Sequence, residues 1–182
     1  LPYREKYSPL GALWYTEIGR IGQVIHVWPY QSIEERTRVR AEAMKDPHWP
    51  PKTGDIVLEM DSEILVPAPF MKPWPLADRN LGEIYEIRTY RYLPEAINEV
   101  IKRWEGSIEA RETYSPLAAC WHTETGRLNK WIHVWPYRDM AHRDEIRAKA
   151  NKDPLWPPPT TREWMISMEN KIVIPSHLSP LH

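Results

Sequence analysis

The chain contains one sequence pattern twice, and this internal repeat constrains its fold more than any other feature. Four motifs recur at a constant offset of 107 residues: YSPL at 7–10 and 114–117, WxTExGR at 14–20 and 121–127, IHVWPY at 25–30 and 132–137, and KDPxWPP at 45–51 and 152–158. One extra residue near Pro159 makes the offset 108 at the end, where ILVP at 64–67 matches IVIP at 172–175. Matches spread this evenly indicate a duplicated unit, whether the duplication serves stability alone or builds a functional site.

The repeat predicts a first unit over residues 1–67, a proline-rich linker over 68–82 and a second unit over 83–182. The first unit begins at the equivalent of Ile108, so it has no counterpart of residues 83–107. A sheet that lacks one strand has an unpaired edge. We expect that strand to belong to the natural polypeptide, outside residues 1–182, in preference to another chain.

Composition argues against two classes of protein. The chain has 24 basic and 25 acidic residues, and nucleic-acid binding needs a basic surplus. No apolar run approaches the roughly 20 residues of a membrane span. The single cysteine, Cys120, cannot form an intrachain disulfide, which is typical of a reducing compartment. We therefore expect a cytoplasmic protein with no nucleic-acid partner and no transmembrane segment.

Apolar periodicity in the second unit predicts the element order strand, helix, strand, strand, helix, strand. The strands are expected at 83–91, 116–125, 128–137 and 163–174, and the helices at 94–108 and 140–152, with Asp139 as an N-cap. This is the ferredoxin-like βαββαβ order, in which both helices pack on one face of a four-stranded sheet. The other face needs a cover, and the first unit can provide it. We therefore predict an α+β fold of two ferredoxin-like units that form an α/β barrel. The first unit lacks its N-terminal strand and most of its first helix.

Alternation along the strands sorts side chains onto two faces. Ile132 and Val134 share one face, which suits packing against helices, so we expect the polar-aromatic face to point into the barrel. The inward set then comprises Glu86, Arg88, Tyr90, Trp131, His133 and Trp135, with Val24, His26 and Trp28 in the first unit. Buried charges cost several kcal/mol unless they are paired or wet. Such an interior predicts a tryptophan-lined pocket for a small molecule.

Two histidines at equivalent strand positions, His26 and His133, are candidate catalytic acid–base residues, and Arg88 would stabilise an anion such as an enolate. Alternatively, each histidine is a core residue that holds a backbone or carboxylate partner. No metal site is predicted, because further ligands at matched spacing are not evident. Cys120 is expected nearly opposite His133; a Cys–His nucleophile is one interpretation, but a buried apolar cysteine is favoured.

The remaining candidates would bind substrate: Glu86, Tyr90, Trp28, Trp131, Trp135 and His122. Glu86 and Arg88 could instead form a structural ion pair. Four helical arginines at i, i+4 spacing are expected to be solvated or paired with loop acids, with gating of the pocket as the alternative: Arg36, Arg40, Arg143 and Arg147. Trp49 and Trp156, within the DPxWPP motifs, are expected to hold their loops against the barrel.

Taken together, three motifs resemble the NIPSNAP family: YEIRTY at 85–90, HVWPY at 133–137 followed by Arg143 and Arg147, and the closing MExKIxIP at 168–175 with SPL at 179–181. The resemblance covers the second unit fully and the first from its middle onward. It implies the dimeric α/β-barrel fold and no defined activity. Animal members are associated with mitochondria, and relatives that share the barrel include cofactor-free monooxygenases, isomerases and haem enzymes. Function carried over from fold alone is analogy.

Two functions follow as hypotheses. The first is a small-molecule protein that binds an apolar or aromatic metabolite in the barrel and could act as a cofactor-free isomerase, lyase or monooxygenase with histidine as acid–base. The second is a non-catalytic scaffold that acts through protein partners. No cofactor is predicted, and haem ligated by a strand histidine is a third alternative. A homo-oligomer is expected.

Overall fold

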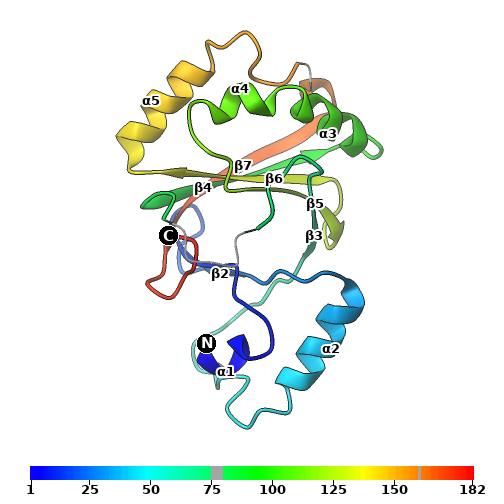
Figure 1. Ribbon diagram of the computed structural model, residues 1–182, viewed down its shortest axis with the longest axis vertical. Helices are drawn as coiled ribbons and strands as arrows, with labels where there is room; N and C mark the ends of the chain where they lie inside the picture. The colour runs from blue at the N-terminus through cyan, green and yellow to red at the C-terminus, as the bar shows by residue number, and fades with distance from the viewer. Residues whose placement is uncertain (75–79, 160) are drawn as a thin grey trace.

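The computed structural model describes residues 1–74, 80–159 and 161–182, and it has an α+β fold built on one curled antiparallel sheet (Figure 1). In these ranges the sheet has seven strands in the order β2-β1-β7-β4-β6-β5-β3. The strands are β1 (Ala12–Ile18), β2 (Val24–Val27), β3 (Ile64–Pro67), β4 (Ile84–Tyr92), β5 (Ala119–Thr125), β6 (Lys130–Tyr137) and β7 (Met165–Pro175). The helices are α1 (Pro2–Glu5), α2 (Ile33–Ala43), α3 (Ile97–Glu105), α4 (Ile108–Glu112) and α5 (Met140–Ala150), with a 3₁₀ turn at Arg162–Trp164.

The central strands confirm the predicted fold class. Their order β7-β4-β6-β5 is that of a ferredoxin-like unit, and α3, α4 and α5 lie together on one side of them (Figure 1). β1, β2 and β3 extend and curl this sheet, which gives a half-barrel. The other side of the central strands therefore faces the barrel interior.

Local sequence explains where the helices begin. The Asp139 side chain accepts a hydrogen bond from the His142 N–H at 2.7 Å, which confirms Asp139 as the N-cap of α5. The helix expected from Pro94 starts later, at Ile97, because Glu95 has a left-handed φ of 70° that is incompatible with a helix. The same stretch also divides at Gly106 and Ser107 into α3 and α4.

The two strand pairs that join β1–β3 to the central sheet have matching registers. Thr16 in β1 lies opposite Val173 in β7, and Thr123 in β5 lies opposite Leu65 in β3. Both pairings shift register at the corresponding position. In the described residues β2 and β3 each have one neighbour, whereas β4 lies between β6 and β7. The half-barrel is therefore open between β2 and β3.

Side-chain contacts also recur at the offset of the repeat. The recurring hydrogen bonds are Arg4 to Ser8 (2.8 Å) and to Tyr30 (2.6 Å), matched by Arg111 to Ser115 (2.9 Å) and to Tyr137 (3.2 Å). These contacts agree with a duplicated unit, although the domain boundaries remain a prediction. Residues 75–79 of the predicted linker lie outside the described residues, and Trp74 before them stacks on Trp121.

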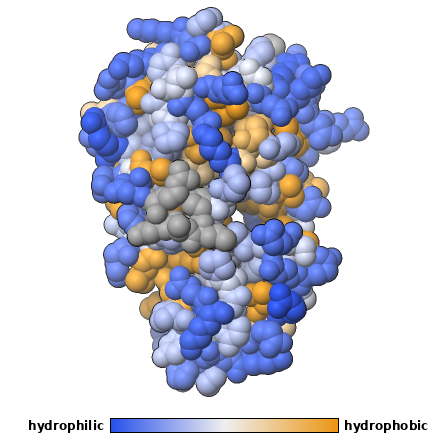
Figure 2. All heavy atoms as spheres, viewed as in Figure 1, coloured by the Kyte–Doolittle hydropathy of each residue, from blue (hydrophilic) through white to orange (hydrophobic). Residues whose placement is uncertain are grey.

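The core has two parts, one on each side of the central sheet, and they correct the predicted assignment of faces. Ile132 and Val134 lie in the barrel interior with Ala12 and Trp14 of β1, not against the helices. The polar-aromatic face packs under α3 and α5 instead. On the exterior, Figure 2 shows a mainly hydrophilic surface with hydrophobic residues in separate groups.

Candidate functional site

The helix-side face of the second half is organised around a fully buried carboxylate, Glu86. Its side chain forms ion pairs with Arg88 on the same strand at 3.0 Å and with Arg143 and Arg147 of α5 at 2.7 and 3.4 Å. The Asn170 side-chain amide donates a further hydrogen bond at 2.8 Å. Glu86 and Arg88 thus form the structural ion pair that was one of the two interpretations of the sequence. Arg143 and Arg147 of α5 are both ion-pair partners of Glu86.

This network corrects the expectation that Arg143 and Arg147 are solvated or paired with loop acids. Burial raises the pKa of Glu86, but the hydrogen bond from Arg143, the charge of Arg88 and the amide of Asn170 outweigh it and hold the pKa below its ordinary value. Glu86 is therefore charged at neutral pH and is balanced by cations from two elements.

His133 lies beside this network in an aromatic cage and not in the barrel interior. Its Nδ1 accepts a hydrogen bond from Trp135 Nε1 at 2.6 Å, and its ring packs against Trp104 at 4.6 Å and Tyr90 at 4.9 Å. His133 Nε2 is buried and has no hydrogen-bond partner in the part of the chain that is described. Burial, with the charges of Arg88, Arg111 and Arg147, places the pKa of His133 well below its ordinary value. This imidazole is therefore neutral at pH 7.

A buried neutral histidine makes stability depend on pH. In the unfolded chain His133 gains a proton near the ordinary histidine pKa of 6.5, whereas in the folded chain it resists protonation. The free energy of unfolding is therefore unaffected by His133 above pH 6.5. Below that pH it falls by up to about 1.4 kcal/mol per pH unit, because the unfolded chain binds a proton that the folded chain does not. Between about pH 7.5 and about pH 5.5, the free energy of unfolding measured by urea denaturation should fall less in His133→Gln than in the wild-type protein.

The control is His26→Gln. His26 accepts the same hydrogen bond, from Trp28 Nε1 at 2.6 Å, but its side chain is exposed. Partial desolvation by its neighbours and the charges of Arg40 and Arg4 lower its pKa as well. Because it is exposed, the His26 variant should change the pH slope less. Identical slopes for wild type and His133→Gln would contradict the prediction.

In the first half the equivalent residues do not form a closed cluster. His26 and Val24 are exposed, and Arg4 lies over the Trp28 ring at 4.4 Å. The aliphatic residues Ile25 and Val27 are the ones that pack against the barrel core. Within the described ranges, Arg36 and Arg40 have no acidic partner within 4.0 Å. His26 is exposed on β2, whereas His133 is buried under the helices, so the structure does not bring the two candidate histidines together into one site.

The other candidates also lie on the helix side. Cys120 is opposite His133 in the β5–β6 register, as predicted. Burial raises the pKa of the Cys120 thiol well above its ordinary value, so the thiol is protonated and is a poor nucleophile. His122 lies opposite Trp131. Trp156 packs on Trp104 at 5.1 Å and on Trp135 at 6.1 Å, which holds its loop against α3 and the sheet.

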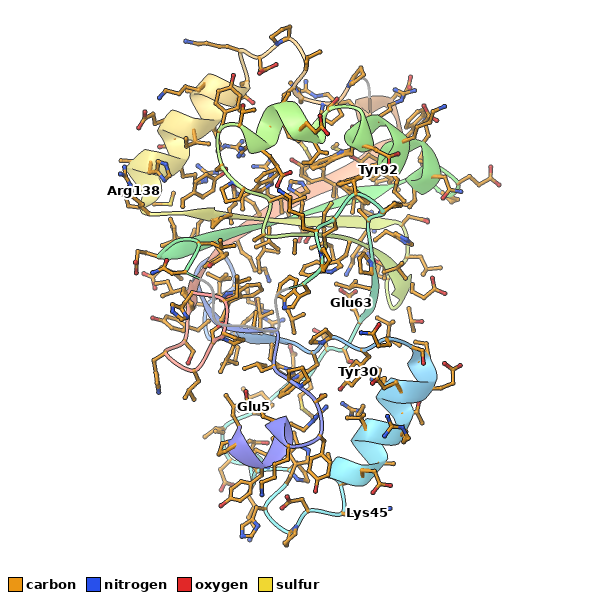
Figure 3. All side chains as sticks on the ribbon, in the orientation of Figure 1. Glu5, Tyr30, Lys45, Glu63, Tyr92 and Arg138 are labelled. Atoms are coloured by element: carbon orange, nitrogen blue, oxygen red, sulfur yellow. The ribbon has the colours of Figure 1, made fainter. Side chains whose placement is uncertain are left out.

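A partly open cavity of about 590 Å³ lies on the opposite, barrel side of the sheet. Alternate residues of β4 and β7 form its floor. Thr89 lies opposite Glu169, and Arg91 lies opposite Ser167. The Arg20 and Arg127 turns and Glu63 complete the wall. Glu63 lies beneath the sheet, on the side away from α3 and α5 (Figure 3).

None of these lining residues was a sequence candidate. The available signal was the alternation of β4, where Ile87, Thr89 and Arg91 share a face that includes a charged residue. The described residues contain no group of three or more histidine, cysteine or acidic side chains arranged to hold a metal ion. They also contain no helix of the length and apolarity needed to cross a membrane.

Comparison with solved structures agrees with this architecture. A NIPSNAP family protein with unknown function from Agrobacterium tumefaciens is 33% identical, with a TM-score of 0.52 over 58% of this chain and 99% of that one. A putative monooxygenase from Fusobacterium nucleatum matches 96% of this chain and 83% of its own, with a TM-score of 0.58. At 11% identity the second likeness concerns the fold alone.

Sequence comparison gives the family. The protein NipSnap homolog 3A of Homo sapiens is 27% identical over 98% of this chain and 74% of its own length. The protein NipSnap homolog of Dictyostelium discoideum is 26% identical over 91% of this chain and 74% of its own. The NIPSNAP family model matches residues 1–72 and 85–180, and the chain therefore belongs to the NIPSNAP family.

Proposed function

We propose that this protein binds a small molecule in the interior of its half-barrel. The observation that carries the proposal is the cavity of about 590 Å³ between the central sheet and the turns that precede β2 and β6. Its volume lies within the range of roughly 300–1,000 Å³ that is typical of ligand pockets. Strands β4 and β7 supply its floor, so the lining is held by rigid elements.

The proposal assigns no chemical step to His133 or Arg88. Both lie on the helix side of the sheet, where Glu86, Trp104 and Trp135 occupy their surroundings. The cavity is lined by the opposite side of β4, through Ile87, Thr89 and Arg91. The helix-side residues are therefore assigned to structure, and binding is assigned to the barrel side.

Native mass spectrometry of freshly purified protein tests this proposal. We expect a mass excess that disappears on denaturation, because a pre-formed cavity retains its ligand. Thr89→Trp should abolish the excess by filling the cavity floor. Thr37→Trp, the same change on the exposed face of α2, is the matched control and should leave the excess intact.

Two outcomes would count against binding in the barrel. A bare mass for the wild-type protein would favour a scaffold that acts through protein partners. A mass excess of equal size in wild type and Thr89→Trp would place the ligand elsewhere on the molecule.

A further inference from the structure

The cavity wall carries more positive than negative charge. Its basic residues are Arg20, Arg91, Arg127, Lys130 and Lys171, and its acidic residues are Glu63 and Glu169. The chain as a whole has one more acidic than basic residue, so this surplus is local. A concave site with a surplus of one charge concentrates ligands of the opposite charge.

Two corresponding corners of the cavity differ in how their lysine is compensated. At one corner Lys130 forms an ion pair with Glu63. At the other, Lys171 Nζ donates a hydrogen bond to Gln23 at 2.9 Å. In the repeat, Gln23 corresponds to Lys130 and Glu63 corresponds to Lys171. The lysine therefore comes from the other position of the pair at the second corner, and its partner there is a neutral amide, whereas the partner at the first corner is a carboxylate.

The environment of Lys171 is unfavourable for its charge. Burial lowers the pKa of its ammonium, Glu169 partly offsets this, and Lys130 and Arg20 lower it further. In the described chain Lys171 has no carboxylate within 4.0 Å. A bound anion would supply the missing counter-charge.

Arg91 is a second cation of this wall, and it has no carboxylate within 4.0 Å among the residues that the structure describes. It lies opposite Lys130 in β6, and like charges on facing strand positions are destabilising. Its Nε is buried and has no hydrogen-bond acceptor among the residues that are described. The Ser167 hydroxyl lies opposite it across the β4–β7 pair and adds a neutral donor to the same wall. A carboxylate or phosphate oxygen matches this set of donors.

We propose that the cavity ligand is a small organic anion, a carboxylate or a phosphate ester, whose charged group is bound at the basic wall that includes Arg91 and Lys171. This inference rests on the proposed function and adds the chemical class of its ligand. Ile87 gives the cavity floor an apolar position for the carbon part of such a molecule.

The test is calorimetric titration of the purified protein at low ionic strength. The anionic probes are benzoate and phenyl phosphate, and the neutral probes of similar shape are benzamide and benzyl alcohol. We expect at least one anion to bind about tenfold more tightly than its neutral counterpart, which is the effect of one good charged contact.

Variants at the two corners should change anion affinity in opposite directions. Gln23→Glu places a carboxylate where Lys171 already donates a hydrogen bond, and it should weaken binding of the anionic probe by about tenfold. Glu63→Gln removes the carboxylate that pairs with Lys130, and it should strengthen binding of the anionic probe. Gln23→Met removes the hydrogen bond without adding charge and should retain anion binding.

The outcomes separate this inference from the proposed function. Equal affinity for neutral and anionic probes, or no effect of Gln23→Glu, would contradict the inference that the ligand is an anion. Either result would still be compatible with the proposed binding of a small molecule. If no probe binds, the molecule retained in native mass spectrometry decides: an anion supports the inference and a neutral compound overturns it. Absence of both probe binding and a retained molecule refutes both proposals.

Discussion

Replacement of Glu86 by glutamine is expected to lower the unfolding free energy by about 3–5 kcal/mol, the usual cost of breaking a buried ion pair from one side. The variant keeps the shape of the side chain but leaves Arg88, Arg143 and Arg147 without their shared counter-charge. Urea denaturation at neutral pH measures the loss. The reason for so large an effect is burial, since Glu86 has no exposed surface.

The same carboxylate predicts a second, acidic limb of the pH profile. Its folded pKa lies below the ordinary glutamate value of 4.5, so its stabilisation is complete above that value and is lost as pH falls through the folded pKa. Glu86→Gln should remove this limb, whereas the His133 contribution at higher pH should remain. The two titrations are therefore separable along the pH axis.

The control for Glu86 is Glu99→Gln. Glu99 pairs with Arg103 at 2.9 Å in an i, i+4 arrangement on α3, but its side chain is 43% exposed. Exposed pairs of this kind contribute under about 1 kcal/mol. If the two glutamate variants lost similar amounts of stability, Glu86 would not be the centre of a buried charge network.

Sequence patterns predicted the elements and the register well because both are local. The alternation over 83–91 matches β4, and the short turn at Gly126 places Cys120 opposite His133. These features depend on residues close together along the chain. The α+β class followed directly from the order of the elements.

The assignment of faces failed for a physical reason. It assumed that the aliphatic side of a strand must take the helices, which holds when the helices offer only apolar side chains. Here α5 offers Arg143 and Arg147 to a carboxylate 57 and 61 positions earlier in the chain. Side-chain partners so far apart in sequence are visible only once the elements are packed. The polar side could therefore be buried under the helices, which left the aliphatic side for the barrel.

The cavity was missed for a related reason, although part of its signal was present. Aligning the two halves places Gln23 on Lys130 and Glu63 on Lys171, so the charge differs between the halves at both positions. These differences have meaning only because Lys130 pairs with Glu63 and Lys171 pairs with Gln23 in the folded chain. Comparison of the halves could thus have marked these positions as different, but not as neighbours.

Truncation of Trp104 to alanine is the second change expected to have a large effect, a loss of about 3–5 kcal/mol in unfolding free energy. This residue anchors α3, a helix with a strongly apolar face, to the sheet. Its ring packs against three others, with ring centroids 5.4 Å apart for Trp131, 4.6 Å for His133 and 5.1 Å for Trp156. Removing it leaves a cavity at the centre of the helix-side core, because its neighbours are held by other contacts and cannot fill the space.

The repeat supplies a graded control for this prediction. Trp156→Ala removes one of the contacts of Trp104, whereas Trp49→Ala changes the corresponding residue of the first half, which has no such tryptophan partner in the described chain. Chemical denaturation should rank the losses as Trp104, then Trp156, then Trp49. Equal losses for Trp156 and Trp49 would mean that the loops are held in the same way in both halves. The expected ranking would show instead that Trp104 of α3 anchors the loop of the second half, and that the loop of the first half lacks this anchor.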